Sequence, residues 1–417
     1  MQPRKAAFAF IFVTVLLDML ALGMIIPVLP EIIKGFVGGD TAQAAHYYGL
    51  FGTTWAAMQF VFAPVLGGLS DRFGRRPVVL ISNFGLGIDY VLTALAPGLS
   101  WLFAARVVSG ITSASVSVAS AYIADVTPPE KRAASFGMLG AAFGLGFVVG
   151  PALGGVLGSV DPRLPFWVAA GLSLANGCYG LFVLPESLAK ESRRPFSWKR
   201  ASPVGSLDML RRHPALLALA ATVFCSMLAH HVLPSCFVLY TGYRYHWDKL
   251  EFGLTLAAVG IGQAVVMTAL VKPTVKRVGE LRALVLGLSF GMFGFLIYGL
   301  APTGLIFLFG VPVMALWGLA GPSAQGMLSR RIGPSEQGAL QGAIGSIQGI
   351  AGMLGPTMFT SIFATAIADP QARLPGMPYL IAAGLMLVAI GIVVGVVRRQ
   401  KVPEPPAQQP AQATATP

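Results

Sequence analysis

Three ionisable residues and one amide stand inside long apolar stretches of this sequence. Asp18 lies about halfway along the apolar run 7–30, and Gln59, Asp89 and Arg106 lie within later runs. A charged side chain at the centre of a bilayer costs roughly 2.5–3.5 kcal/mol or more, so its presence there indicates a functional role. Because a carboxylate in a low-dielectric environment binds a proton more tightly, Asp18 and Asp89 are suited to trade a proton for a cationic or metal-bound substrate.

Asp89 and Arg106 are expected to lie at similar depth, because the run 77–97 is followed at once by the antiparallel run 99–121. Two interpretations of this pair remain open: it belongs to a proton and substrate site, or it only holds two helices together. The sequence suggests no basic partner for Asp18, which favours a functional role for that carboxylate.

Two adjacent histidines, His230 and His231, lie within the later apolar run 215–240. Neighbouring residues on a helix point about 100° apart, so at most one of them is expected to face a central cavity. A histidine can carry a proton near pH 6.5, and the alternative is a histidine hydrogen-bonded between helices. Further residues that could line a substrate cavity are Gln263, Phe290, Met292, Trp317 and Gln325.

The composition excludes a soluble protein. Of the 417 residues, 55% are hydrophobic and 11% are charged, whereas a soluble domain has roughly 45–50% apolar and about 25% charged residues. A soluble enzyme, a coiled coil and a disordered protein are therefore excluded, and an integral membrane protein remains. The net charge of +12 indicates loop topology rather than nucleic-acid binding, because Lys and Arg collect in cytoplasmic loops.

The sequence lacks the usual patterns of metal, disulfide and catalytic sites. Its three cysteines stand in apolar stretches without a CxxC spacing, and its five histidines form no HExxH pattern. We therefore expect no cofactor and no resident metal, and the absence of a nucleophile motif argues against an enzyme.

Twelve apolar runs are long enough to cross a bilayer, which takes about 20 mostly apolar residues. This predicts an all-α membrane protein with an N-terminal six-helix bundle over 1–185, a cytoplasmic linker over 186–214, a C-terminal six-helix bundle over 215–398 and a disordered tail over 399–417. The runs are 7–30, 46–66, 77–97, 99–121, 133–158, 164–184, 215–240, 252–271, 281–301, 303–325, 336–366 and 377–397.

Basic residues gather at one end of the predicted bundle. The end that carries both termini and the even-to-odd loops holds 23 of the 29 Lys and Arg residues, the other end holds five, and Arg106 lies inside a helix. Because positively charged loops stay in the cytoplasm, we expect both termini and the long linker to be cytoplasmic.

The second half of the chain repeats landmarks of the first half at an offset near 205. Arg72–Gly74 corresponds to Arg277–Gly279, and Gly150–Pro151 corresponds to Gly355–Pro356. Two parallel six-helix halves with a substrate site between them are a known transporter architecture. A channel or a membrane enzyme does not require such a duplication.

The connection after the second run, residues 67–77, reads GGLSDRFGRRP. This loop resembles the signature loop of the major facilitator superfamily, with the acid, both glycines and all three arginines in place. The resemblance implies two pseudo-symmetric six-helix bundles and a latch between cytoplasmic helix ends in one conformational state. The expected latch residues are Asp71, Arg72, Arg75, Arg76 and Asp125.

Small residues recur around a proline in the fifth run, at Gly146, Gly150, Pro151, Gly154 and Gly155. Small residues at such spacings let helices approach closely, and a proline bends a helix. In position this pattern resembles the antiporter motif of the drug/proton exporters, which implies export in exchange for protons. Ordinary helix packing is the alternative.

Nearly the whole chain, apart from the linker and the tail, is similar to the tetracycline/proton antiporters. In that family, the residues that match Asp18, Gln59, Asp89 and Arg106 belong to the substrate and proton path. Segments that carry the similarity include LD at 17–18, IPVLP at 26–30, RVVSGIT at 106–112, AYIAD at 121–125 and LPES at 184–187.

Two positions depart from that family. Its ninth helix carries an aspartate where this chain has Gly291, and its eighth helix carries a histidine where this chain has Gln263. Tetracyclines cross as a positively charged chelate with a divalent metal. The loss of a carboxylate from the second half therefore weakens the match to that cargo.

We therefore expect a monomeric, proton-coupled antiporter of a bacterial inner membrane that works by alternating access. Its cargo would be a hydrophobic drug-like molecule, with the tetracycline–magnesium chelate as the first candidate, and magnesium would enter only as part of that cargo. One alternative is a proton-coupled transporter of a metabolite or siderophore, which the missing ninth-helix acid favours. The other is a non-transporting membrane receptor, for which the connections are short.

Overall fold

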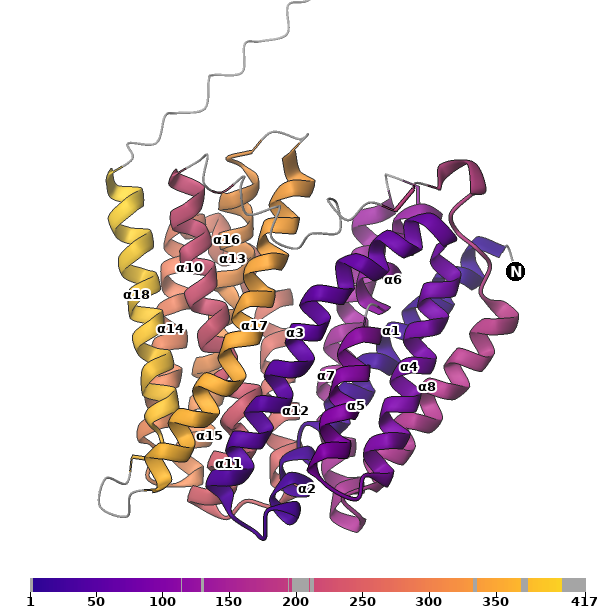
Figure 1. Ribbon diagram of the computed structural model, residues 1–417. Helices are drawn as coiled ribbons and strands as arrows, with labels where there is room; N and C mark the ends of the chain where they lie inside the picture. The colour runs from indigo at the N-terminus through magenta and orange to yellow at the C-terminus, as the bar shows by residue number, and fades with distance from the viewer. Residues whose placement is uncertain are drawn as a thin grey trace, which may run out of the picture.

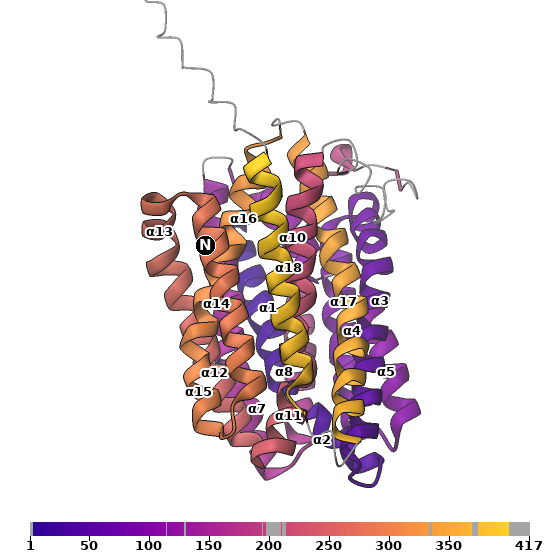
Figure 2. The same cartoon turned by 90° about the vertical axis from the view of Figure 1, so that its left-hand side faces the viewer.

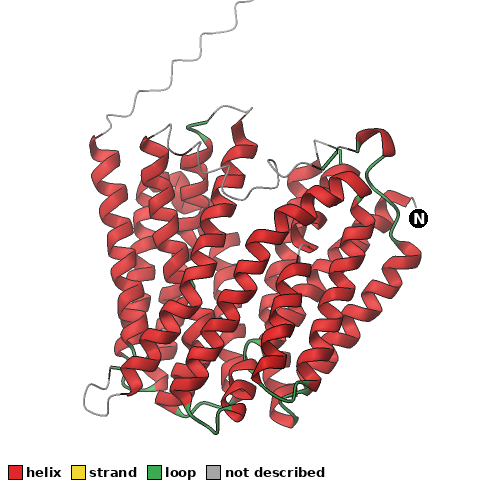
Figure 3. Ribbon diagram, viewed as in Figure 1, coloured by secondary structure: helices red, strands yellow, loops and turns green. Residues whose placement is uncertain are grey.

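The protein is built from α-helices, and the residues that the structure describes contain no strand (Figure 3). This computed structural model describes residues 3–113, 115–128, 131–193, 195–196, 210, 214–332, 336–368 and 374–399. Most of the predicted linker 186–214 and the predicted tail from residue 400 lie outside these ranges.

The described part of the first half forms eight α-helices, and the helices of the second half are interrupted more often. The first set is α1 (Pro3–Ile25), α2 (Leu29–Phe36), α3 (Thr41–Phe73), α4 (Arg75–Leu95), α5 (Leu99–Thr112), α6 (Ser115–Val126), α7 (Arg132–Val160) and α8 (Leu164–Val183), followed by the short η2 (Lys190–Ser192). The second set is α10 (Pro214–His230), α11 (Val232–Tyr245), α12 (Lys249–Val265), the π-helix η4 (Val266–Leu270), α13 (Val271–Val278), α14 (Glu280–Leu300), α15 (Gly304–Ala315), the 3-10 helix η5 (Leu316–Leu319), α16 (Ala320–Ser329), α17 (Gln337–Ala368) and α18 (Met377–Arg399).

The described residues contain ten helices long and apolar enough to cross a membrane, or eleven if the bent pair α1–α2 counts as one span. The predicted fourth run, 99–121, differs from the structure because it is not one helix. It divides into α5 with 14 residues and α6 with 12 residues, and neither is long enough to span a bilayer alone. The protein is therefore a multi-pass, all-helical membrane protein.

The helices are arranged as two bundles side by side. In Figure 1, α1 and α4–α8 lie in one bundle, α10–α18 lie in the other, and α3 and α17 cross next to each other between them. Figures 1 and 2 show α1 beginning at the same end of the molecule at which α18 finishes, which is named the terminal end here. The loop between α11 and α12 lies at the other end, named the opposite end.

Helix α7 contacts its own half through the glycines of the predicted antiporter motif. A Cβ atom at Gly150 would lie 2.7 Å from the carbonyl oxygen of Leu20 on α1, and one at Gly154 would overlap the backbone of Met24. Gly146 packs in the same way on Met19. Only glycine permits this approach, so these three positions bring the backbones of α1 and α7 into direct contact.

The next glycine of the motif faces the other half of the protein. A Cβ atom at Gly155 would lie 2.5 Å from the carbonyl oxygen of Lys249 on α12, and Gly253 of α12 packs against the backbone of Pro151. Gly355–Pro356 of α17 occupies the position in the second half that Gly150–Pro151 of α7 occupies in the first. There Gly355 packs on His231 in its own half, and Pro356 packs on Gly52 of α3 in the first half.

Hydrogen bonds also join the halves where α3 crosses α17. The Thr53 hydroxyl donates to the carbonyl oxygen of Met353 at 2.8 Å, and the Thr357 hydroxyl donates to Thr53 at 2.8 Å. The Tyr48 hydroxyl donates to the carbonyl oxygen of Pro234 at 3.0 Å. These contacts lie in the parts of the helices nearer the opposite end, and the ribbons of the two halves diverge toward the terminal end (Figure 1). The halves are therefore packed together at the opposite end.

We expect Gly154→Leu to lower the thermal unfolding temperature of the purified protein by several degrees. The new side chain would meet the Met24 backbone, and overpacking of this kind typically costs about 1–3 kcal/mol. The matched control is Gly144→Leu on the same helix, where a Cβ atom meets nothing within 4 Å. Equal unfolding temperatures for the two variants would show that α1 and α7 do not depend on this contact.

Candidate functional site

Asp89 and Arg106 form a buried ion pair between α4 and α5. One guanidinium nitrogen of Arg106, Nη2, donates to both carboxylate oxygens of Asp89, at 3.0 and 2.8 Å, and to the Thr93 hydroxyl at 3.2 Å. Asp89 is fully buried and Arg106 is 8% exposed. The two residues therefore meet at the same depth, as their positions in sequence predict, and each compensates the charge of the other.

Asp18 is the second buried carboxylate of the first half, with 4% of its surface exposed on α1. The buried Tyr90 on α4 lies within electrostatic range of Asp18, Asp89 and Arg106. The electrostatic surroundings of this tyrosine thus include charged side chains from α1, α4 and α5. Sequence reasoning assigned no role to Tyr90, although its position directly after Asp89 was a signal.

Gln59 is placed at the break between α5 and α6. Its side-chain amide donates to the hydroxyl of Ser113 at 3.1 Å and to the carbonyl oxygen of the same residue at 3.4 Å. Ser113 is the C-cap residue that follows α5, so its carbonyl lacks a regular helical partner. Gln59 therefore joins α3 to a helix end and does not contact the Asp89–Arg106 pair through these bonds.

The two histidines mark the point at which α10 gives way to α11. His230 is an exposed residue although it stands midway along the span Leu216–Tyr245. Polar side chains at such depth almost always face the bundle interior or a water-filled cavity. His231 instead packs on α17 beside Gly352 and Gly355, so the two rings have different surroundings.

Trp317 connects His230 to the rest of the second half. The ring centroids of the two residues are 5.6 Å apart, and the indole nitrogen of Trp317 donates to the Ser226 hydroxyl at 3.3 Å. The indole also lies against Gly291 of α14, where a Cβ atom would be 3.0 Å from its ring. Trp317 therefore fills the space into which a side chain at position 291 would project.

Several helices of the second half are interrupted close to these side chains. Helix α12 passes into the π-helix η4 three residues after Gln263, and α15 passes into the 3-10 helix η5 that contains Trp317. The amide of Gln263 lies beside Gly318 of η5, so the two interruptions adjoin. Interrupted helices and π-bulges recur at the functional sites of transporters and other proteins.

The positions of the remaining residues proposed for the cavity give less support for a role in binding substrate. Phe290 and Met292 on α14 and Gln325 on α16 are partly exposed. Met292 packs against the main apolar core, which favours a packing role. Across the described ranges, no group of three or more His, Cys, Asp and Glu side chains could hold a metal ion.

The signature loop forms a network within the first half at the terminal end. Arg75 forms ion pairs with Asp71 at 2.5 Å and with Asp125 of α6 at 3.3 Å, and it donates to the Ser70 hydroxyl at 2.6 Å. The guanidinium of Arg72 lies over the ring of its neighbour, Phe73. In this conformation Arg75 therefore ties α3, α4 and α6 together, rather than joining one half to the other.

Glu186, which follows α8, completes this network. Its carboxylate accepts hydrogen bonds from the backbone nitrogens of Arg75 at 2.8 Å and Arg76 at 3.3 Å. These are the first two residues of α4, where unpaired N–H groups favour a negative charge. The Arg76 side chain returns to α8 by donating to the carbonyl oxygen of Leu181 at 2.5 Å. Sequence reasoning did not assign this capping role to Glu186.

We expect Asp89→Asn and Arg106→Gln each to lower the unfolding temperature, because breaking a buried ion pair from one side costs about 3–5 kcal/mol. The double variant should unfold at a higher temperature than either single variant, since it leaves no uncompensated charge. Asp71→Asn is the control, because the Asp71 side chain is 46% exposed and exposed pairs contribute about 0–1 kcal/mol. Strictly additive effects of the two changes would contradict a coupled pair.

Comparison with known proteins agrees with this architecture. The pattern of the Major Facilitator Superfamily matches residues 11–356. The chain is 37% identical over 384 residues to the class C tetracycline resistance protein of Escherichia coli, covering 92% of this chain and 95% of that protein. It is 36% identical over 381 residues to the class G tetracycline resistance protein of Vibrio anguillarum, covering 90% and 94%.

A solved structure gives the same result for the fold. The crystal structure of the human organic anion transporter MFSD10 superposes with a TM-score of 0.69 at 22% identity, and the match covers 94% of this chain and 100% of that one. The relatives and the structural neighbours are transporters and not enzymes. With the family pattern over most of its length and relatives above 30% identity, this chain belongs to the Major Facilitator Superfamily of membrane transporters.

Proposed function

We propose that this transporter is a proton-coupled antiporter that exports a hydrophobic drug-like molecule, with the tetracycline–magnesium chelate as the first cargo to test. The observation that carries the proposal is the similarity to tetracycline resistance proteins over more than nine-tenths of the chain. The two buried carboxylates, Asp18 and Asp89, supply the chemistry that proton exchange requires.

Asp18 is the group that exchanges the proton in this proposal. It is buried on α1, and Arg106 is already bound to Asp89 by two hydrogen bonds. A cationic cargo that approaches Asp18 stabilises the charged carboxylate and so displaces its proton. Arg106 holds Asp89 in a fixed orientation, and Tyr90 lies within electrostatic range of both acids.

The way in which the halves meet supports alternating access as the transport mechanism. If α5 and α6 together cross the membrane once, the chain has twelve spans, with both termini on one side. We assign the terminal end to the cytoplasm, since basic residues gather there. The conformation described is then closed toward the outside, and cargo enters between the halves from the cytoplasm of a bacterial cell. A single chain holds the whole site, so a monomer suffices.

A second cargo class has one specific observation in its favour. Gly291 supplies no carboxylate to the second half, and the Trp317 indole fills the adjoining space. A metal chelate with net positive charge finds no carboxylate beside position 291 to stabilise it. A planar apolar molecule, such as an aromatic metabolite, can stack on the Trp317 indole. Under this alternative, proton exchange at Asp18 remains and the dependence on magnesium disappears.

We expect purified protein in weakly buffered detergent solution to release protons when tetracycline and magnesium are added. Asp18→Asn should abolish this release, because the amide has no proton to exchange. The measurement is the absorbance of a pH-sensitive dye. The control is Asp161→Asn, which changes an exposed aspartate in the loop before α8.

Folding of each variant is checked by thermal unfolding before the comparison. Undiminished release from Asp18→Asn would move the exchange to another group, with His230 the next to test. No release from the folded unmodified protein would remove tetracycline as the leading cargo. In that case the same dye assay with a panel of planar aromatic compounds tests the second cargo class.

We expect Gly291→Asp alone to lower the unfolding temperature, because its side chain meets the Trp317 indole. Combined with Trp317→Ala, the aspartate should be accommodated, and tetracycline binding should then depend more strongly on magnesium than in the unmodified protein. Calorimetric titration with and without magnesium measures this, with Trp317→Ala alone as the control. An undisturbed Gly291→Asp variant would show that the indole does not occupy this space.

A further inference from the structure

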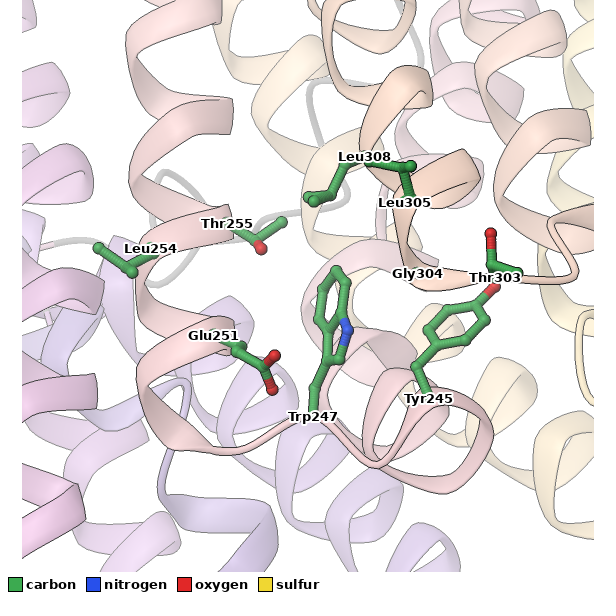
Figure 4. Close-up of a pocket in the computed structure, with 9 residues that line it drawn as sticks. All are labelled: Tyr245, Trp247, Glu251, Leu254, Thr255, Thr303, Gly304, Leu305 and Leu308. Atoms are coloured by element: carbon green, nitrogen blue, oxygen red, sulfur yellow. The ribbon is translucent and has the colours of Figure 1, made fainter.

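A lateral pocket lies in the second half at the opposite end, away from the residues discussed above. It has a volume of about 620 Å³, within the range of about 300–1,000 Å³ usual for small-molecule sites. Figure 4 shows it between the first turns of α12 and α15, with the loop that joins α11 to α12 beneath it.

One wall of this pocket is apolar and faces outward from the bundle. Leu254 of α12 is 55% exposed, and Leu305 of α15 is 66% exposed. Leucines so exposed on membrane-spanning helices are expected to contact lipid, since no aqueous surface would favour them. The aromatic residues Tyr245 and Trp247, where α11 ends, also line the pocket, and the Trp247 ring stands between α12 and α15 (Figure 4). Aromatic residues at the ends of spans mark the boundary between the hydrocarbon core and the headgroups.

The pocket has one charged lining residue, Glu251. One of its carboxylate oxygens, Oε2, accepts from the backbone nitrogen of Asp248 at 2.8 Å in the capping box that begins α12. The side chain remains exposed, and Figure 4 shows the carboxylate turned toward Trp247 and the pocket. The Tyr245 hydroxyl donates its proton to the carbonyl oxygen of Ala301 at 2.8 Å, so this proton is not available to a molecule in the pocket.

We propose that this pocket binds one phospholipid of the surrounding leaflet through a primary ammonium headgroup, that is, a phosphatidylethanolamine. The ammonium group donates hydrogen bonds to Glu251, and an acyl chain lies along Leu254 and Leu305. An anionic headgroup is disfavoured by the single negative lining charge, and a choline headgroup has no N–H to donate. The pocket lies at the boundary between the hydrocarbon core and the headgroups. The leucines therefore contact acyl chains, and the Glu251 carboxylate lies at the level of the headgroups.

Helix α12 takes part both in the pocket and in the contact between the two halves, so a lipid in the pocket can affect that contact. The same first turns that line the pocket include Gly253, which packs on Pro151 of α7 in the first half. A lipid held between α12 and α15 therefore stabilises α12 in the position that closes the opposite end.

The test is native mass spectrometry of the purified full-length protein with dioleoyl phosphatidylethanolamine, phosphatidylcholine or phosphatidylglycerol. The ethanolamine lipid should bind most tightly. Glu251→Gln should weaken its binding about three- to fivefold, the effect expected for one partly exposed charge, change binding of the choline lipid less and not weaken binding of the glycerol lipid. Glutamine preserves the capping box, so this variant keeps the start of α12 intact. Glu31→Gln, at the same end in the first half, is the control.

A second variant tests the apolar wall independently. Leu305→Trp adds bulk at a lipid-facing position, so it should fold normally and reduce bound ethanolamine lipid by obstructing the pocket. Equal binding of all three lipids, equal binding of the choline and ethanolamine lipids, or an unchanged profile in Glu251→Gln would overturn the assignment. None of these outcomes depends on the cargo or on proton coupling.

Discussion

The structure depends on two helices, each of which packs against its own half and the other half at once. Helix α7 presents Gly146, Gly150 and Gly154 to α1 and presents Gly155 to α12. Helix α17 repeats the arrangement with Gly355 and Pro356. Because a glycine at each of these contacts lets the neighbouring helix approach closely, the fit of the two surfaces depends on their register. In the alternating access proposed above, these contacts are the ones that must separate and rejoin as the halves move as rigid bodies.

The two halves share this packing and differ in their charges. The first half buries Asp18 and the Asp89–Arg106 pair, whereas the second half has the exposed residue His230 beside Trp317. A buried carboxylate needs a cation or a proton, and an indole needs neither. In the first half the groups that can bind a proton are carboxylates, whereas in the second half such a group is His230, and the planar apolar ring of Trp317 lies beside it. This asymmetry is the physical reason why family membership does not settle the cargo.

Much of the architecture could be predicted from the sequence, because the membrane restricts the choices so strongly. Long apolar runs must be helices, the offset near 205 places Gly355–Pro356 on the same element as Gly150–Pro151, and the short loop between two antiparallel runs brings Asp89 to the depth of Arg106. The helix interruptions were not predicted. Hydropathy along 99–121 or 303–325 is continuous, and a break in a helix does not change which residues are apolar.

The sequence by itself determined the membrane class, the superfamily, the repeat and the identity of the buried charges, since each rests on residue type and spacing. Only the tertiary structure decided which groups meet. It placed Gln59 on Ser113, Glu186 at the start of α4 and Trp317 in the space beside Gly291. These contacts join residues on different elements, 54 or more positions apart in the first two cases. Side-chain neighbours across helices depend on crossing angle and rotation, which periodicity along one helix does not specify.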